Sequence, residues 1–234
     1  LAFGTETVPD VYKIFGPGNQ YVTAAKQIVS QQGVAIDMPA GPSEVAVIAD
    51  DSAVPAFVAS DMLSQAEHGA DSQVMLVTND ENMVKDVKNA LEKQMDILPR
   101  KVFAKKALEN SRIFLMDDKD DMIEMINEYA PEHLIISTKD AEAVADRIKN
   151  AGSVFLGHYT PESAGDYASG TNHTLPTNGH ARAYSGVNLD DYVKKITFQR
   201  ITKDGLNDIG PVIETMAEAE KLMAHKYAVQ VRLK

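Results

Sequence analysis

Short apolar runs recur along the chain and alternate with longer segments in which polar and apolar residues mix. The runs are rich in Val, Ile, Leu and Ala, and their length and composition are typical of buried strands. Several of the segments between them open on Asp, Asn or Ser, which favour the N-cap of a helix. We therefore predict strands at residues 13–15, 34–36, 44–49, 73–78, 112–115, 134–137 and 153–156.

The predicted helices lie between these strands. They cover residues 21–32, 54–66, 80–95 and 99–109, a segment ending near 129, and 140–150. Strands that alternate with helices of this length form βαβ units with parallel strands and right-handed crossovers. The pattern predicts an α/β fold, a mostly parallel sheet with helices on both faces.

The alternation ends after residue 156. Residues 157–186 are rich in Gly, Ser, Thr, Asn, Pro and His, and so long a loop in a compact domain is usually functional or disordered. Its tyrosines and Leu175 give it surface to bury, which argues against disorder. We expect a boundary near Gly186 and then a small α+β segment, with a turn near 190–193, a strand at 195–200 and helices at 210–218 and 219–228.

Composition narrows the class of protein. The chain has 234 residues, 44% of them hydrophobic, and a formal net charge of −11, so a nucleic-acid partner is not expected. No apolar run has the length of a membrane span, and a cytoplasmic location fits the absence of cysteine. A cysteine nucleophile and a thiolate zinc site are excluded. Because Leu1 is not an initiator methionine, we expect the chain to be the rear part of a longer protein.

The first candidate for chemistry is the pair Gln65 and His68. Their i,i+3 spacing places both side chains on one face of a helix, where they can hold a cation between them. A polar helix end with a capping histidine is the alternative, and the pattern alone favours it. The strand, glycine turn and helix around Gly16-Pro17-Gly18-Asn19 leave a similar choice between nucleotide binding and a tight turn.

Several other polar residues are expected at the same edge of the sheet. Ser43 lies just before a predicted strand, and Glu132 and His133 lie between a predicted helix and a strand. Helix ends and strand starts share one edge of a parallel sheet, although ligands usually bind at the opposite edge. A carboxylate beside an imidazole offers two bases of different pKa. A surface turn that needs no function is the alternative.

Asp166 and His225 are further candidates on other segments. Asp166 is a possible hard oxygen ligand or a turn aspartate beside glycine. His225 follows Glu220 by five residues, which is off the i,i+4 face, so one straight helix does not aim both at one ligand.

Seven segments together resemble the histidinol dehydrogenase family, in that family's order and across essentially the whole chain. They are FGTETVP, FGPGN, DMPAGPSE, SQAEHG, APEHL, PESAGDYASGTNHTLPT and AHKYAV. Members of this family are much longer, and roughly the first half of their chain has no counterpart here. The resemblance implies the NAD-dependent oxidation of L-histidinol through L-histidinaldehyde to L-histidine, the last steps of histidine biosynthesis, with zinc as a cofactor.

The resemblance also assigns roles to residues. Glu132 and His133 match the acid–base residues, and Asn19 matches an NAD-contacting asparagine. The positions that match zinc ligands are Gln65, His68, Asp166 and His225. The positions that match substrate contacts are Ser43, Gln65, His68, Glu132, His133, Asp166, Glu220 and His225.

The domain organisation follows from the same resemblance. Residues 1–42 match the rear part of a Rossmann-like dinucleotide domain, and residues 43–187 match an incomplete Rossmann-like catalytic domain that holds the zinc. Residues 188–234 match a small segment that crosses to the partner subunit of a homodimer. There Glu220 and His225 complete the neighbour's site.

The chemistry agrees with these roles. Without a cysteine to capture the aldehyde, the second oxidation has to pass through a hydrated aldehyde, with one base for the alcohol and one for water. His133 suits the alcohol, Glu132 suits the water, and a zinc ion with a glutamine ligand suits positioning of the substrate. Two alternatives remain: an inactive fragment of such an enzyme, and a zinc hydrolase that uses Glu132.

Overall fold

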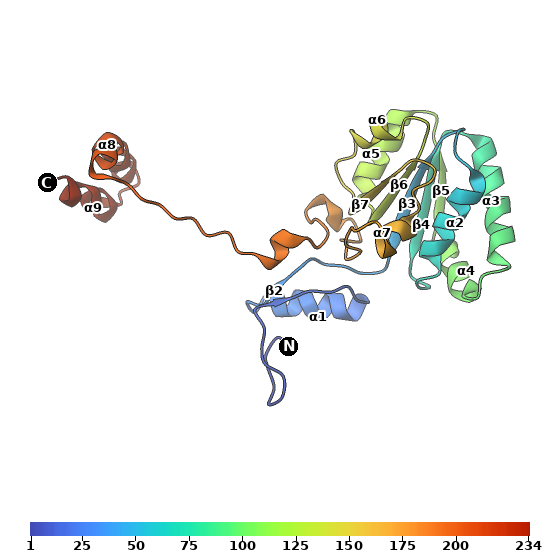
Figure 1. Ribbon diagram of the computed structural model, residues 1–234, viewed down its shortest axis with the longest axis horizontal. Helices are drawn as coiled ribbons and strands as arrows, with labels where there is room; N and C mark the ends of the chain where they lie inside the picture. Colours follow the sequence, from blue (N-terminus) through green and yellow to red (C-terminus); the bar gives the residue numbers. More distant parts are fainter. The chain divides into compact units, whose positions relative to one another are not determined.

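A parallel five-stranded sheet is the larger of two sheets in the structure, a computed structural model that describes residues 1–234 (Figure 1). The chain divides into two compact units, Leu1–Tyr192 and Val193–Lys234, and the sheet belongs to the first. Its strand order is β5-β4-β3-β6-β7. The strands are β3 (Glu44–Ala49), β4 (Gln73–Thr78), β5 (Arg112–Leu115), β6 (His133–Ser137) and β7 (Ser153–Leu156), which confirms the five predicted strands to within one residue.

Helices cover both faces of this sheet, as predicted (Figure 1). One face packs against α2 (Pro55–Ala66), α3 (Glu81–Met95) and α4 (Lys101–Glu109). The other packs against α5 (Lys119–Tyr129) and α6 (Ala141–Ala145), of which α6 is shorter than predicted. The strands divide their side chains between the two cores by simple alternation. In β3, Val45 and Val47 face the first core and Ala46 and Ile48 the second.

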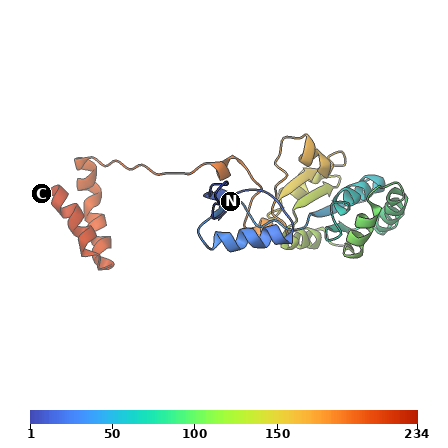
Figure 2. The same cartoon turned by 90° about the horizontal axis from the view of Figure 1, so that it is seen from below.

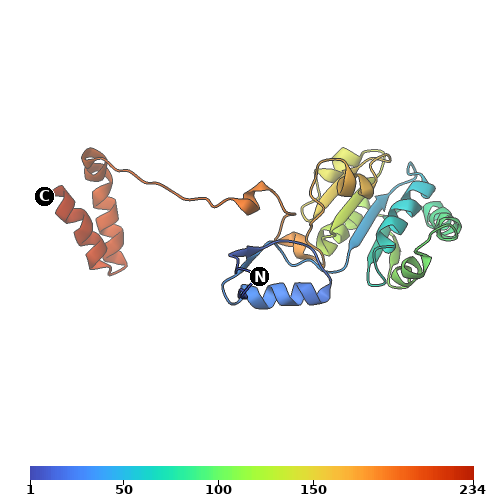
Figure 3. The same cartoon turned by 60° about the horizontal axis from the view of Figure 1, so that its bottom comes forward.

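The first unit also contains a short parallel pair, β1 (Lys13–Ile14) and β2 (Ala35–Ile36), with α1 (Gln20–Ser30) beside it (Figure 3). Asn19 caps α1 by accepting hydrogen bonds from the amides of Tyr21 and Val22. The buried Lys26 forms an ion pair with Asp37.

The long segment after β7 is largely irregular but ordered by its own contacts. It contains α7 (Glu162–Tyr167) and two short 3-10 helices, η1 (His180–Arg182) and η2 (Leu189–Tyr192). The hydroxyl of Thr177 accepts a hydrogen bond from the amide of Gly41 at 2.6 Å. This contact ties the segment to the loop that leads into β3.

The second unit consists of α8 (Lys203–Ala219) and α9 (Met223–Leu233), which lie side by side (Figure 2). Lys221, with a left-handed φ of 61°, lies in the turn between them. The predicted strand at residues 195–200 is wrong, because those residues form no ladder with any other strand. A β-strand needs a hydrogen-bonded neighbour, and no strand pairs here. None of the helices has the length and apolar character needed to cross a membrane.

The carboxyl edge of the sheet is closed by hydrogen bonds between its own residues. Asp50, just after β3, accepts from the amides of Ser52 and Lys139 at 3.0 and 3.1 Å, and from the Ser52 hydroxyl. His158, just after β7, bonds through Nδ1 to the Ser137 hydroxyl at 2.8 Å and through Nε2 to Ser52 at 3.3 Å. The edge at which α/β sheets usually bind ligands is therefore held by its own side chains.

Candidate functional site at the amino edge of the sheet

The starts of β3 and β6 place polar residues together at the opposite edge. Val45 pairs with His133 in the parallel register, so Glu44 and Glu132 are neighbours across the two strands. The Glu44 amide donates to the Glu132 carboxylate at 2.8 Å. Both carboxyl groups are buried, and His133 is only 3% exposed.

The two ring nitrogens of His133 face different surroundings. Nδ1 lies 3.1 Å from the carbonyl oxygen of Glu44 and 3.6 Å from Oε2 of Glu132. Nε2 lies 3.9 Å from Oε1 of Glu162 and 3.9 Å from Oδ1 of Asp166. Nε2 has no hydrogen-bond partner within the protein. Because Nδ1 has a carbonyl acceptor, the proton of the neutral ring belongs on Nδ1, which leaves the Nε2 lone pair available.

Helix α7 supplies the two carboxylates on the Nε2 side. Glu162 and Asp166 are four residues apart and share one face of this helix. Gly165 lets the helix approach closely, because a Cβ there would lie 2.7 Å from the ring of Phe155 on β7. The ring of Phe155 is in turn 6.0 Å from that of His133. A glycine in the sequence therefore sets the position of the two acidic residues.

Glu162 is the most deeply buried carboxyl group of this cluster. It is 1% exposed, and its Oε2 accepts a hydrogen bond from the Ser64 hydroxyl on α2 at 2.9 Å. Its Oε1 has no partner. Metal-ligating atoms of His133, Glu162 and Asp166 lie within 4.8 Å of one another, a spacing that allows one cation to contact all three.

Burial shifts the pKa values of the cluster. It raises the pKa of Glu162 from 4.5 to about 7, and that of Glu44 from 4.5 to about 7. For His133 burial lowers the pKa, but the hydrogen bond and charge of Glu132, with the charge of Glu162, outweigh it and raise the pKa. The cluster therefore favours positive charge, either on His133 or on a bound cation.

A cavity of about 310 Å³ lies beside Glu44. Oε1 of Glu44 accepts from the amide of Asn178 at 2.9 Å, whereas its buried Oε2 has no partner. Polar side chains of α1, including Gln20 and Gln27, line the same cavity. It thus lies between the helix that follows the glycine turn and the start of β3.

Gln65 and His68 differ sharply in their surroundings. Gln65 is 0% exposed, and neither Oε1 nor Nε2 of its amide has a partner. It follows Ser64 on α2, the helix that packs against α7. His68 is exposed just past the end of α2, where its carbonyl accepts from Arg100. A buried amide without partners is costly, so Gln65 is suited to a ligand.

The remaining predicted site residues lie elsewhere or are less engaged. Ser43 is half-buried directly before β3, and Asn19 is exposed at the start of α1. Glu220 and His225 are exposed in the second unit. The structure thus gathers Glu132, His133 and Asp166 in one place.

Glu162 and Glu44 belong to the cluster but are not singled out by any pattern in the sequence. The i,i+4 spacing of Glu162 and Asp166 was a usable signal, but only if residues 162–167 had been predicted to be helical. Glu44 is the first residue of an apolar run, and no neighbouring polar residue marks it as part of a site.

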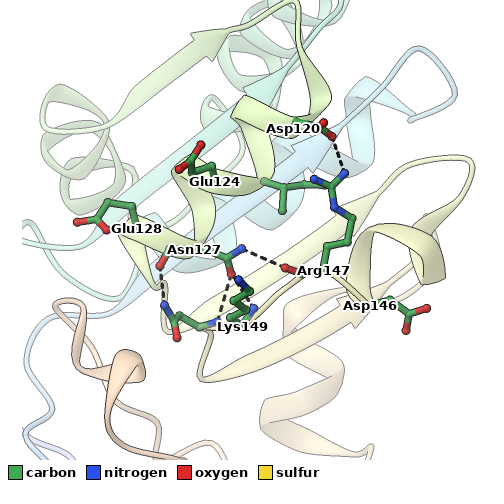
Figure 4. Close-up of a pocket in the computed structure, with 9 residues that line it drawn as sticks. Asp120, Glu124, Asn127, Glu128, Asp146, Arg147 and Lys149 are labelled. Carbon is green, nitrogen blue, oxygen red and sulfur yellow. Dashed lines mark hydrogen bonds and ion pairs between the residues drawn. The ribbon is translucent and has the colours of Figure 1, made fainter.

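A second, larger groove of about 690 Å³ lies between α5 and the turn after α6 (Figure 4). There the Asn127 amide donates to the Arg147 carbonyl at 3.1 Å and accepts from Lys149 at 2.6 Å, while Arg147 pairs with Asp120. These polar groups have partners within the protein, in contrast to those around His133. The candidate functional site is therefore the cluster at the amino edge of the sheet.

The fold and the amino-edge cluster define a class of protein: an α/β enzyme-like domain with a buried histidine among carboxylates and room for a cation. The family model for histidinol dehydrogenase matches residues 1–233, and the chain belongs to this family.

Named relatives agree with this assignment. The chain is 64% identical to histidinol dehydrogenase of Bacteroides fragilis (strain YCH46) over all of its own length and 54% of that protein. It is 57% identical to histidinol dehydrogenase of Haemophilus influenzae, again over all of its length and 55% of the relative. The crystal structure of histidinol dehydrogenase from Elizabethkingia anophelis superposes with a TM-score of 0.96 at 63% identity, covering 99% of this chain and 54% of that one. The chain spans about half the length of these relatives.

Proposed function

We propose that the protein containing this chain is a zinc-dependent histidinol dehydrogenase that oxidises L-histidinol through L-histidinaldehyde to L-histidine with two NAD. The observation that carries the proposal is the amino-edge cluster, in which the buried Nε2 of His133 has no hydrogen-bond partner and lies 3.9 Å from oxygens of both Glu162 and Asp166. The family membership of the whole chain supports the same reaction. A cytoplasmic location is part of the proposal.

The residues present fit a zinc ion. The unpaired amide oxygen of Gln65 and the carboxylate of Asp166 are oxygen ligands of the kind that zinc accepts. His68 and His225 are the further ligands implied by the resemblance, and His225 would come from a partner subunit. When bound, the ion supplies a positive charge that orients the substrate and offsets the buried carboxylates.

His133 is the proposed base for the alcohol. Its Nδ1–H is held by the carbonyl of Glu44, which aims the Nε2 lone pair at the region between Glu162 and Asp166. The Glu132 carboxylate beside Nδ1 stabilises the positive ring that forms once Nε2 has taken the proton. Ser43 and Glu220 are proposed to contact the substrate.

The dinucleotide is proposed to contact Asn19. This residue caps α1, so the turn that holds it is fixed relative to the helix. The coenzyme supplies the hydride acceptor. In the proposed homodimer the C-terminal segment, with Glu220 and His225, completes the site of the neighbour.

Steady-state assays of the complete gene product that contains these 234 residues test the proposal. L-Histidinol with NAD and zinc should yield L-histidine and two NADH per substrate, and zinc removal should abolish turnover. Absence of NADH formation with zinc bound would contradict the proposed reaction. Turnover of an amide or ester without NAD would favour a zinc hydrolase instead.

The 234-residue chain assayed alone addresses a separate alternative, the inactive fragment. We expect little or no NADH formation from it, because the resemblance places most NAD contacts outside these residues. Activity equal to that of the complete gene product would show that the dinucleotide site is complete within this chain.

A further inference from the structure

The two sides of the His133 ring carry different carboxylates. Glu132 lies on the Nδ1 side, and its Oε2 already accepts from the Glu44 amide at 2.8 Å. Glu162 lies on the Nε2 side with Oε1 unpaired. Since Nδ1 bonds to a carbonyl, Nε2 is the nitrogen that can take a proton from a substrate. The carboxylate next to the reacting nitrogen is therefore Glu162.

The position of Glu162 is fixed from two directions. Ser64 holds the other oxygen, Oε2, at 2.9 Å, and the close approach of α7 through Gly165 sets the helix that carries it. The side chain is 1% exposed, so water from bulk solvent does not compensate the free oxygen. An anchored, buried carboxylate with one free oxygen needs a hydrogen-bond donor in the site.

The spacing of the two acceptors selects the kind of donor. Oε1 of Glu162 and Nε2 of His133 are 3.9 Å apart, too far for a direct hydrogen bond. Two hydroxyl groups on the same carbon can donate one bond to each acceptor at about 2.8 Å. A hydrated aldehyde has this pair of hydroxyl groups, whereas a primary alcohol has only one.

We propose that Glu162 is a catalytic residue of the second oxidation, in which its free oxygen accepts a hydrogen bond from one hydroxyl of the hydrated aldehyde while His133 takes the proton of the other. This inference rests on the proposed function and assigns to Glu162 a contact that the resemblance does not assign. Asp166 is left to the zinc ion.

The step balances with the groups already named. The hydrate loses a hydride from carbon to the nicotinamide coenzyme and a proton from one hydroxyl to Nε2. The oxygen of that hydroxyl becomes the carbonyl oxygen of the acid, and the hydroxyl held by Glu162 becomes its OH group. Glu162 orients the hydrate and gains no bond to carbon.

The test compares Glu162→Gln with Glu132→Gln in the complete gene product. NADH formation is followed from L-histidinaldehyde, and separately from L-histidinol with semicarbazide present to trap the aldehyde. Glu162→Gln should slow aldehyde oxidation about 10- to 100-fold, the cost of one hydrogen bond to a charged group, and change the alcohol reaction much less. Equal losses in both reactions, or a selective loss in Glu132→Gln alone, would overturn the inference.

Binding measurements separate this role from a structural or metal-binding one. Zinc content and the affinity for L-histidinol, measured by calorimetry without coenzyme, should stay near wild type in Glu162→Gln. Loss of zinc would make Glu162 a metal ligand and overturn the inference. If Glu162→Gln does not fold, Glu162→Asp is used instead, because it keeps the charge but moves the carboxylate away from His133. It should likewise slow aldehyde oxidation more than alcohol oxidation. Wild-type protein inactive with both substrates would instead contradict the proposed function.

Discussion

The two edges of the central sheet treat their buried polar groups in opposite ways. At the carboxyl edge, Asp50 accepts three hydrogen bonds and His158 uses both ring nitrogens. At the amino edge, Gln65, His133 and Glu162 each keep at least one buried polar atom without a partner. At the carboxyl edge only the Thr138 hydroxyl is buried without a partner, whereas several such atoms lie together at the amino edge, where a ligand could pair with them. Unpaired buried polar atoms thus indicate a candidate site at the amino edge, whereas strand topology alone would indicate the carboxyl edge.

The acidic groups of the two edges are also tuned in opposite directions. Burial raises the pKa of Glu44 to about 7. At Asp50 burial would raise the pKa, but the bonds from Ser52 and Lys139 outweigh it and lower the pKa below 3.8. At the amino edge the buried carboxylate of Glu44 is therefore destabilising when charged. At the carboxyl edge the charged carboxylate of Asp50 stabilises the fold.

The largest effect is expected from His133→Asn. Without a base at Nε2, the alcohol oxidation should slow by about 10²- to 10⁴-fold, the usual contribution of a general base. The complete gene product is assayed with L-histidinol and NAD, and circular dichroism checks the fold. A variant that retains wild-type kcat would place the base elsewhere.

Glu44→Gln should change how stability depends on pH. The folded pKa of about 7 lies above the unfolded value of 4.5. The wild type is therefore most stable below pH 4.5, and its free energy of unfolding falls by about 3 kcal/mol as the pH rises through 7. The variant lacks this loss. Urea unfolding of both proteins between pH 4.5 and 7.5 measures it, and parallel stability profiles would contradict the raised pKa.

Asp50→Asn should have the opposite pH profile. The wild-type carboxylate stabilises the fold above pH 3.8, and this contribution disappears as the pH falls through its lowered folded pKa. We expect the free energy of unfolding of the variant to be about 2 kcal/mol below that of the wild type at pH 7, with a smaller difference at pH 3. Zinc content should be unchanged. A loss of zinc in this variant would mean that the two edges are not independent.

The smallest effect is expected from a matched pair, Gln65→Leu and Thr138→Val. Each replaces a buried side chain whose polar atoms lack partners, the first on α2 and the second after β6 at the carboxyl edge. Without zinc, both should gain up to about 1 kcal/mol of unfolding free energy, because no desolvated polar atom remains. Only Gln65→Leu should weaken zinc binding, as measured by calorimetry. Equal zinc affinities in the two variants would remove Gln65 from the ligand set.

The sequence pattern correctly predicted the strands in the region where strands and helices alternate. It predicted one strand wrongly, because whether a segment forms a strand depends on pairing with another strand. The runs of Val, Ile and Leu at 44–49, 73–78 and 153–156 form strands with the predicted bounds. Residues 195–200 (KITFQR) instead alternate polar and apolar side chains, a pattern that is also typical of a strand, but they pair with no strand. Strand formation depends on a partner that local pattern does not reveal.

Some residues of the candidate site are marked by the local sequence, and others join it only through tertiary contacts. Glu132 and His133 could be singled out because they adjoin a predicted strand at the edge of the sheet where the candidate site lies. Glu162 could not, since it lies in a loop-like stretch, and it is brought to His133 by the close approach of Gly165 to Phe155 and by the hydrogen bond from Ser64. The roles proposed for Glu220 and His225 depend on the proposed partner subunit.

The most direct test is a crystal structure of the complete gene product with zinc, using an anomalous difference map collected at the zinc absorption edge. We predict a peak at the amino edge of the sheet, about 2.0–2.2 Å from Oε1 of Gln65 and from a carboxylate oxygen of Asp166. A peak among Asp50, Ser52 and His158, or none beside Gln65 and Asp166 at saturating zinc, would contradict the account.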